Sequence, residues 1–205
     1  MESIKAPLLE YGVANFTVPG QGESGDHHLV CCSERGILIA AIDGIGHGQE
    51  ASRAAKAAVA ILRAGANQPV ISLVQQCHEE LRAMRGVVLS VASIDPVDGM
   101  MTWLGIGNVQ GVLTRSNGKK GNAKEPLLLR AGVVGSQLPL LQAAVLPVAQ
   151  GDTLFFATDG VRSDFAETLS ALENPQRAAD RILENYHSGN DDALVVVARF
   201  TRIPA

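Results

Sequence analysis

Two Asp-Gly steps, each placed directly after an apolar run, constrain the fold of this chain more than any other feature. The first run, residues 36–42, is followed by Asp43-Gly44, and the second, residues 153–158, is followed by Asp159-Gly160. A third acidic element, Asp191-Asp192, precedes the apolar run 193–200. Carboxylates that meet at strand ends repel one another unless a cation neutralises them. Because hard divalent ions prefer oxygen ligands, the pattern predicts a Mg²⁺ or Mn²⁺ site that acts on phosphate.

Composition is typical of one globular domain, so residues 1–205 are expected to fold as a single unit. The chain has 205 residues, of which 46% are hydrophobic and 19% charged, a balance that argues against disorder. The net charge of −4 offers no basic surface for nucleic acid. No uninterrupted apolar run reaches the ~18 residues of a membrane helix, and the first residues lack a signal-peptide pattern. Three cysteines, an odd number without metal-type spacing, fit reduced thiols and predict a cytoplasmic protein.

The order of the expected elements indicates an α+β fold of antiparallel sheets covered by helices. Hairpins alternate with helices inserted in pairs, which fits a doubly wound parallel sheet less well. A polar tip at 116–122 separates two strands of one hairpin, and residues 132–150 show no regular pattern. We expect strands over 10–18, 29–42, 87–94, 100–104, 109–114, 126–130, 153–158 and 193–200, and helices over 49–66, 69–85, 163–172 and 174–187.

The turn after the first apolar run carries several chemically useful groups. The Asp43 carboxylate can bridge two cations, and Gly44, without a side chain, lets its carbonyl approach a metal. The helix that follows has an N-terminus that favours anions. His47 in this turn could give a proton to a leaving oxygen, or could simply cap the helix or face solvent. Taken one at a time, the acidic segments also fit ordinary turns; these segments are the two Asp-Gly steps, Asp191-Asp192 and the loop Ser24-Gly25-Asp26. Among lysines and arginines, only Arg162 is near enough in sequence to neutralise one of these acids.

Several other catalytic templates are absent from the sequence. It contains no G-x-x-x-x-G-K-[ST] phosphate loop and no G-x-S-x-G nucleophile elbow. Gly105-Ile106-Gly107 lacks the third glycine of a dinucleotide fingerprint. No two histidines are spaced as H-x-x-x-H, which argues against a zinc site.

Three segments resemble the signature elements of metal-dependent serine/threonine protein phosphatases of the PPM (type two C) superfamily, in particular its SpoIIE-like branch. These segments are Asp43-Gly44-Ile45-Gly46-His47-Gly48, Ala157-Thr158-Asp159-Gly160-Val161 and Asp191-Asp192-Ala193-Leu194-Val195-Val196-Val197, and Ser24-Gly25-Asp26 fits the early acidic element. The resemblance implies a four-layer α-β-β-α sandwich with two Mn²⁺ or Mg²⁺ ions. The implied metal ligands are Asp26, Asp43, the Gly44 carbonyl, Asp159 and Asp191, with Asp43 shared by both ions.

The same resemblance implies the reaction and the substrate. The implied reaction is in-line attack on the phosphoryl group by a hydroxide that the metal ions would activate, without a phosphoenzyme. The implied substrate is phosphoserine or phosphothreonine on a STAS-domain protein of a stressosome or partner-switching pathway. Two departures bear on the proton donor and the metal site: Leu194 stands where the family commonly has Thr, and His47 lies one position later than the histidine of eukaryotic relatives. The arginine that binds phosphate in those relatives has no counterpart before Asp26.

Two other functions remain open from the sequence. The chain could be a docking module of the same fold that regulates a partner without catalysis, although the retained acids favour an enzyme. It could also be a metal-dependent phosphohydrolase of small molecules such as nucleotides or sugar phosphates.

Overall fold

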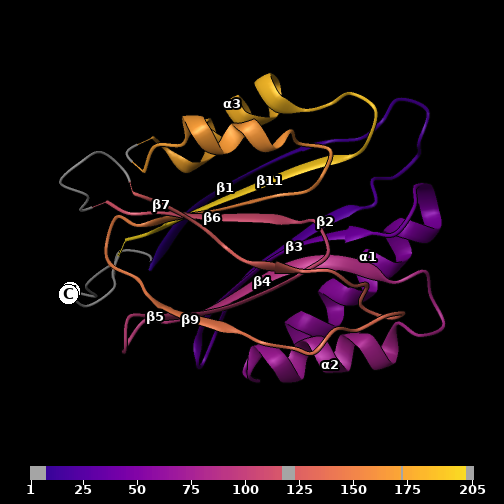
Figure 1. Cartoon of the computed structure of the whole chain (residues 1–205), viewed down its shortest axis with the longest axis horizontal. Helices are drawn as coiled ribbons and strands as arrows, with labels where there is room; N and C mark the ends of the chain where they lie inside the picture. Colours follow the sequence, from indigo (N-terminus) through magenta and orange to yellow (C-terminus); the bar gives the residue numbers. More distant parts are fainter. Residues whose placement is uncertain (1–7, 117–122, 172, 202–205) are drawn as a thin grey trace, which may run out of the picture.

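Two facing sheets with helices on their outer sides make up the molecule (Figure 1). The computed structural model describes residues 8–116, 123–171 and 173–201. One sheet has the strand order β1-β11-β10-β6-β7 and the other β2-β3-β4-β5-β8, with β9 paired to β5. The strands are β1 (Leu9–Phe16), β2 (Asp26–Ser33), β3 (Gly36–Gly44), β4 (Val87–Asp95), β5 (Met100–Ile106), β6 (Gln110–Thr114), β7 (Lys124–Pro126), β8 (Leu129–Arg130), β9 (Ala144–Pro147), β10 (Thr153–Ala157) and β11 (Ala193–Phe200).

The outer face of the second sheet is covered by α1 (Gly48–Ala64) and α2 (Val70–Glu80). A stripe of alanines on α1 is fully buried there, including Ala51, Ala54 and Ala58. Small side chains at helical spacing let the helix backbone approach the sheet closely. This close approach matters for function because α1 begins directly after the Asp43-Gly44 turn.

The space between the two sheets is filled by side chains that alternate along each strand. On β3, Ile37, Ile39 and Ala41 face the opposite sheet, whereas Leu38 and Ile42 face the helices. The position of Asp43, two residues after Ala41, therefore directs its side chain into the space between the sheets.

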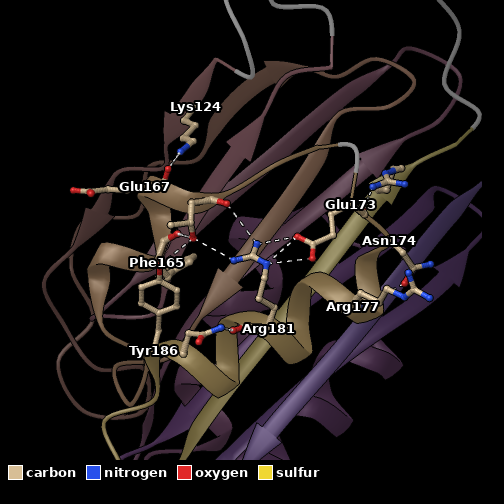
Figure 2. Close-up of polar contacts among 11 residues, drawn as sticks. Lys124, Phe165, Glu167, Glu173, Asn174, Arg177, Arg181 and Tyr186 are labelled. Carbon is tan, nitrogen blue, oxygen red and sulfur yellow. Dashed lines mark hydrogen bonds and ion pairs between the residues drawn. The ribbon is translucent and has the colours of Figure 1, made fainter.

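The outer face of the first sheet packs against α3 (Pro175–Tyr186) and the short 3₁₀ helix η1 (Ser163–Thr168). The Arg181 guanidinium on α3 donates to both carboxylate oxygens of Glu173, from Nε to Oε1 at 3.1 Å and from Nη2 to Oε2 at 2.8 Å (Figure 2). It also donates to the Thr168 hydroxyl. The Tyr186 hydroxyl donates to the same Thr168 oxygen. These contacts hold η1 against α3, and η1 follows Asp159 closely in the sequence.

The architecture confirms the α+β, four-layer α-β-β-α prediction, with three apolar layers between the four. Several strand predictions were wrong in detail. The run 29–42 is two strands, because Glu34-Arg35 forms a turn that the apolar flanks conceal. The run 126–130 divides between both sheets, and 132–150 contains β9. Residues 163–172 hold the six-residue η1 rather than an α-helix, and most of the predicted tip at 116–122 lies outside the described residues.

Within the part of the chain that the structure describes, no helix combines the length and apolarity that a membrane crossing demands.

Candidate metal centre

Two of the predicted site residues are direct neighbours across one pair of strands. Asp26 opens β2 and pairs with Asp43 near the end of β3 in the antiparallel register. Side chains of such a pair lie on one face of the sheet, about 5 Å apart at Cβ. The pattern of β3 turns this face toward the other sheet, so both carboxylates lie at one end of the sandwich, between the sheets.

The other sheet brings its acids to the same end. Asp159 follows β10, and Asp191-Asp192 precede β11, which runs antiparallel beside β10. The Thr158 amide donates to the Leu194 carbonyl at 3.1 Å, which continues this pairing to the edge where the acids stand. The structure therefore brings segments that are more than a hundred residues apart in sequence to one edge of the fold.

A buried threonine joins the two sheets at this end. The Thr158 hydroxyl, which has no solvent exposure, donates to Asp26 Oδ2 at 2.6 Å and accepts from the Leu194 amide at 2.8 Å. Asp26 itself is only 6% exposed. Thr158 was not among the predicted site residues; the signal for it was a hydroxyl residue at the end of an apolar run, directly before an Asp-Gly step.

The adjacent acids Asp191 and Asp192 have different environments. Asp192 is buried, and its carboxylate accepts from the amides of Val18 at 2.9 Å and Gly25 at 2.7 Å. It therefore anchors the loop that carries Asp26. Asp191 is exposed, and its carboxylate accepts only from the Asp192 amide among the described contacts. Of this pair, Asp191 is the one whose oxygens remain accessible to a ligand.

Electrostatic repulsion links these carboxylates. Burial first, and then the charges of Asp26, Asp159 and Asp191, together raise the pKa of Asp43 to about 8. Burial likewise raises the pKa of Asp26 to about 7, against the Thr158 hydrogen bond, which lowers it. The pKa of Asp159 is raised by loss of hydration and by Asp191. In the protein alone, these acids resist ionising together.

No arginine or lysine neutralises the cluster among the described ion pairs. Arg162, the cation nearest in sequence to Asp159, pairs instead with Asp164 at 3.4 Å and lies over the Tyr186 ring. Asp159 accepts a 2.6 Å hydrogen bond from the Asn108 side chain, on the turn between β5 and β6. Asn108 is a second residue that sequence reasoning missed, because nothing in the local pattern around it points to this site.

The turn after Asp43 is tightly packed. A Cβ on Gly44 would lie 2.2 Å from the Ala51 carbonyl oxygen, so α1 can start where it does only because this residue is glycine. The Gly44 amide donates to the Gly25 carbonyl at 3.1 Å, which joins the turn to the Asp26 loop. His47 is exposed at the N-terminal cap of α1, and its side chain makes no capping hydrogen bond.

The chemistry of this donor set fits a hard divalent cation. Its groups are carboxylates that repel one another and a backbone carbonyl, the ligands that Mg²⁺ and Mn²⁺ prefer. Across the described residues, no three acidic, histidine or cysteine side chains converge closely enough to enclose an ion as they stand. Asp159 and Asp191 are both exposed, so their side chains can turn toward an ion without disturbing the core.

Comparison with known proteins agrees with this fold. The family model described as Stage II sporulation protein E (SpoIIE) matches residues 33–201. The phosphoserine phosphatase RsbX of Bacillus subtilis (strain 168) is 20% identical over 183 residues, which cover 89% of this chain and 90% of RsbX.

Solved structures share the fold over nearly the whole chain. A structure described as "The bacterial stressosome: a modular system that has been adapted to control secondary messenger signaling" has a TM-score of 0.84 and 29% identity, covering 93% of this chain and 99% of that one. RsbX in complex with magnesium has a TM-score of 0.83 at 18% identity, covering 94% and 96%. The catalytic domain of PstP in complex with two manganese ions has a TM-score of 0.72 at 18% identity, covering 94% and 98%.

Proposed function

Because this chain belongs to the SpoIIE family of PP2C-type serine/threonine phosphatases, we propose that it removes phosphate from phosphoserine or phosphothreonine of a STAS-domain regulatory protein. The chain is thus a hydrolase of the protein phosphatase class. Its relatives support the choice of substrate: RsbX is a phosphoserine phosphatase, and the most similar of the structures compared above is described as a stressosome structure.

The observation that carries the proposed mechanism is the meeting of carboxylates from both sheets at one end of the sandwich. We assign Asp26, Asp43, Asp159, Asp191 and the Gly44 carbonyl as the groups that hold two Mn²⁺ or Mg²⁺ ions. When bound, the ions supply Lewis-acid activation of water and of the phosphoryl oxygens. The raised pKa values of Asp26 and Asp43 support this assignment, because bound cations favour the ionised carboxylates.

The chain's own residues perform the remaining tasks. Thr158 fixes one oxygen of Asp26 and leaves the other free to face a ligand. Asp192 holds the Asp26 loop against the start of β11, and Asn108 restrains Asp159. Hydrolysis joins a water oxygen to phosphorus and breaks the bond from phosphorus to the serine or threonine oxygen. The exposed His47, on the turn beside Asp43, is the residue that we assign to protonate this leaving oxygen from a ring nitrogen.

Release of inorganic phosphate from a phosphorylated STAS-domain protein tests this function directly. We expect Mn²⁺-dependent release by the wild-type protein and a loss of at least a hundredfold in Asp43→Asn. Asp164→Asn is the matched control, because Asp164 is an exposed acid that pairs with Arg162 away from the cluster. Equal rates in the wild type and Asp43→Asn would refute the role of Asp43.

The alternatives give different results in the same assay. A docking module would bind the phosphoprotein but release no phosphate with any divalent ion. A small-molecule phosphohydrolase would turn over nucleotides or sugar phosphates much faster than the phosphoprotein.

A further inference from the structure

We propose that Arg85, together with Arg53, forms a subsite for an anionic group of the substrate next to the phosphorylated residue. The anionic group is a carboxylate or a second phosphate two or three residues from the phosphoserine or phosphothreonine. This inference rests on the proposed phosphatase function and assigns a specificity determinant to it.

The subsite is a cavity of about 230 Å³ between the start of α1 and the turn from α2 to β4. Two arginines and one acid supply its charged lining, and Ala83 and Met84 supply an apolar wall. Met84 is 40% exposed, so this wall is open to a partner. The cavity is lined by Glu50, Arg53, Ala83, Met84 and Arg85.

Arg85 reaches the turn that follows Asp43. The Ile45 amide donates to the Gly86 carbonyl at 3.1 Å, which sets the two segments side by side. A Cβ built on Gly46 would lie only 2.6 Å from Arg85 Nη1, so the guanidinium lies directly against this glycine. Gly46 also has a φ of +94°, a conformation that other residues rarely adopt. The turn thus provides a bare backbone surface on which the arginine rests.

The separation between Asp43 and Gly46 suggests that the cavity takes a residue flanking the phosphorylated one, rather than the phosphorylated residue itself. Gly46 is three residues after Asp43, so at most about 11 Å separate their Cα atoms. An extended peptide spans about 3.4 Å per residue, so its side chain two or three positions from the reacting phosphate falls in this range.

The charges of the cavity favour an anion. Arg85 Nε pairs with Glu50 Oε2 at 2.5 Å, and this pair is more than half exposed on both sides. One acid thus faces two arginines, and the guanidinium retains further N–H groups for an incoming acceptor. Glu50 shows that a carboxylate fits against Arg85. An exposed pair of this kind is weak enough for a substrate group to compete with it.

The two arginines give the cavity a positive charge on a chain whose net charge is negative. The chain carries a net charge of −4, and the neighbouring cluster gathers several carboxylates. A phosphoprotein with acidic flanks is itself anionic, so arginines beside the site favour its approach to a chain of net negative charge. By contrast, the other described arginine on this turn, Arg82, pairs with Glu79 at 3.0 Å away from the cavity.

Steady-state kinetics with three substrates test the proposal: a phosphopeptide with acidic residues two and three positions from the phosphoserine, the same peptide with alanines there, and p-nitrophenyl phosphate. We expect Arg85→Ala to raise KM for the acidic peptide roughly tenfold, as loss of a charge-assisted hydrogen bond predicts. KM for the other two substrates stays within twofold. Arg53→Ala shifts KM in the same direction, Glu50→Gln lowers it for the acidic peptide, and Arg82→Ala is the control without effect.

Two results would overturn the proposal. One is an Arg85→Ala variant that keeps the wild-type preference between the two peptides. The other is an equal loss on p-nitrophenyl phosphate, which would place Arg85 on the reacting phosphate. Fluorescence anisotropy of the labelled peptides on Asp43→Asn with Mn²⁺ measures the same preference without turnover. Absence of turnover in the wild type, with the anisotropy preference intact, would therefore reject only the phosphatase function.

Discussion

Replacing Thr158 with valine removes one hydroxyl at the junction of the two sheets and changes the side-chain shape little. The hydroxyl makes two buried hydrogen bonds, to Asp26 Oδ2 at 2.6 Å and from the Leu194 amide at 2.8 Å. In Thr158→Val both partners stay buried without this contact. The variant therefore isolates the energetic contribution of the link between the sheets.

The size of the effect follows from the two groups left unpaired. Each buried group without a partner costs about 1–3 kcal/mol, so Thr158→Val should lose roughly 2–6 kcal/mol of unfolding free energy. For a domain of this size, 1 kcal/mol corresponds to about 2–4 °C in Tm. We therefore expect Tm to fall by about 4–24 °C.

The loss should also depend on pH. Burial raises the pKa of Asp26 to about 7 although the Thr158 hydrogen bond lowers it, so valine at position 158 raises that pKa further. When the pKa of a carboxyl is higher in the folded than in the unfolded protein, ionising that carboxyl destabilises the folded protein. The loss of stability begins above the unfolded-state pKa of about 4 and grows until the pH passes the folded-state pKa. The Tm difference between Thr158→Val and wild type should thus be larger at pH 8 than at pH 5.

Thermal unfolding followed by circular dichroism, with a chelator to keep the protein metal-free, measures both effects. Thr158→Ser keeps the hydroxyl and should stay close to the wild type. Thr114→Val is the matched control, because the Thr114 hydroxyl is fully buried and has no hydrogen-bond partner among the described residues. If Thr158→Val and Thr114→Val have the same Tm, or if the loss is the same at both pH values, the reasoning about Thr158 is wrong.

Three further predictions concern the acids and the turn. In the metal-free protein, Asp43→Asn should raise Tm by several degrees at pH 9 and little at pH 5, because the wild type loses stability as pH rises from about 4 through the Asp43 pKa of about 8; a Tm scan against pH checks this. Asp192→Asn should lower Tm by several degrees, because the single oxygen of an asparagine side chain cannot accept from the backbone N–H groups of both Val18 and Gly25. Asp191→Asn should leave Tm nearly unchanged but weaken Mn²⁺ binding measured by calorimetry. The reverse ranking would contradict these roles. His47→Asn should reduce kcat at least tenfold more for phosphoserine peptides than for p-nitrophenyl phosphate, whose leaving group needs no proton, and an equal loss on both would exclude His47 as the proton donor.

Much of the fold could be predicted because its signals are local. Apolar runs bounded by turn residues gave β4, β5, β10 and β11 close to their observed bounds, and the alanine stripe gave α1. The errors arose where a local pattern has two outcomes. Residues 29–42 are apolar through a turn, so the hairpin of β2 and β3 reads as one strand. Residues 129–130 cross to the other sheet to pair with β5, which no local pattern records.

The sequence by itself determined the kinds of group at the site: carboxylates at strand ends, a glycine directly after Asp43 and a histidine in the same turn. These features follow from the residues and their immediate neighbours. Only the tertiary structure decided which of Asp191 and Asp192 stays accessible, that Thr158 joins the sheets through Asp26, and that Arg85 lies on Gly46. Each of these depends on contacts between segments far apart in the sequence, which the folding of the two sheets brings together, so no local pattern records them.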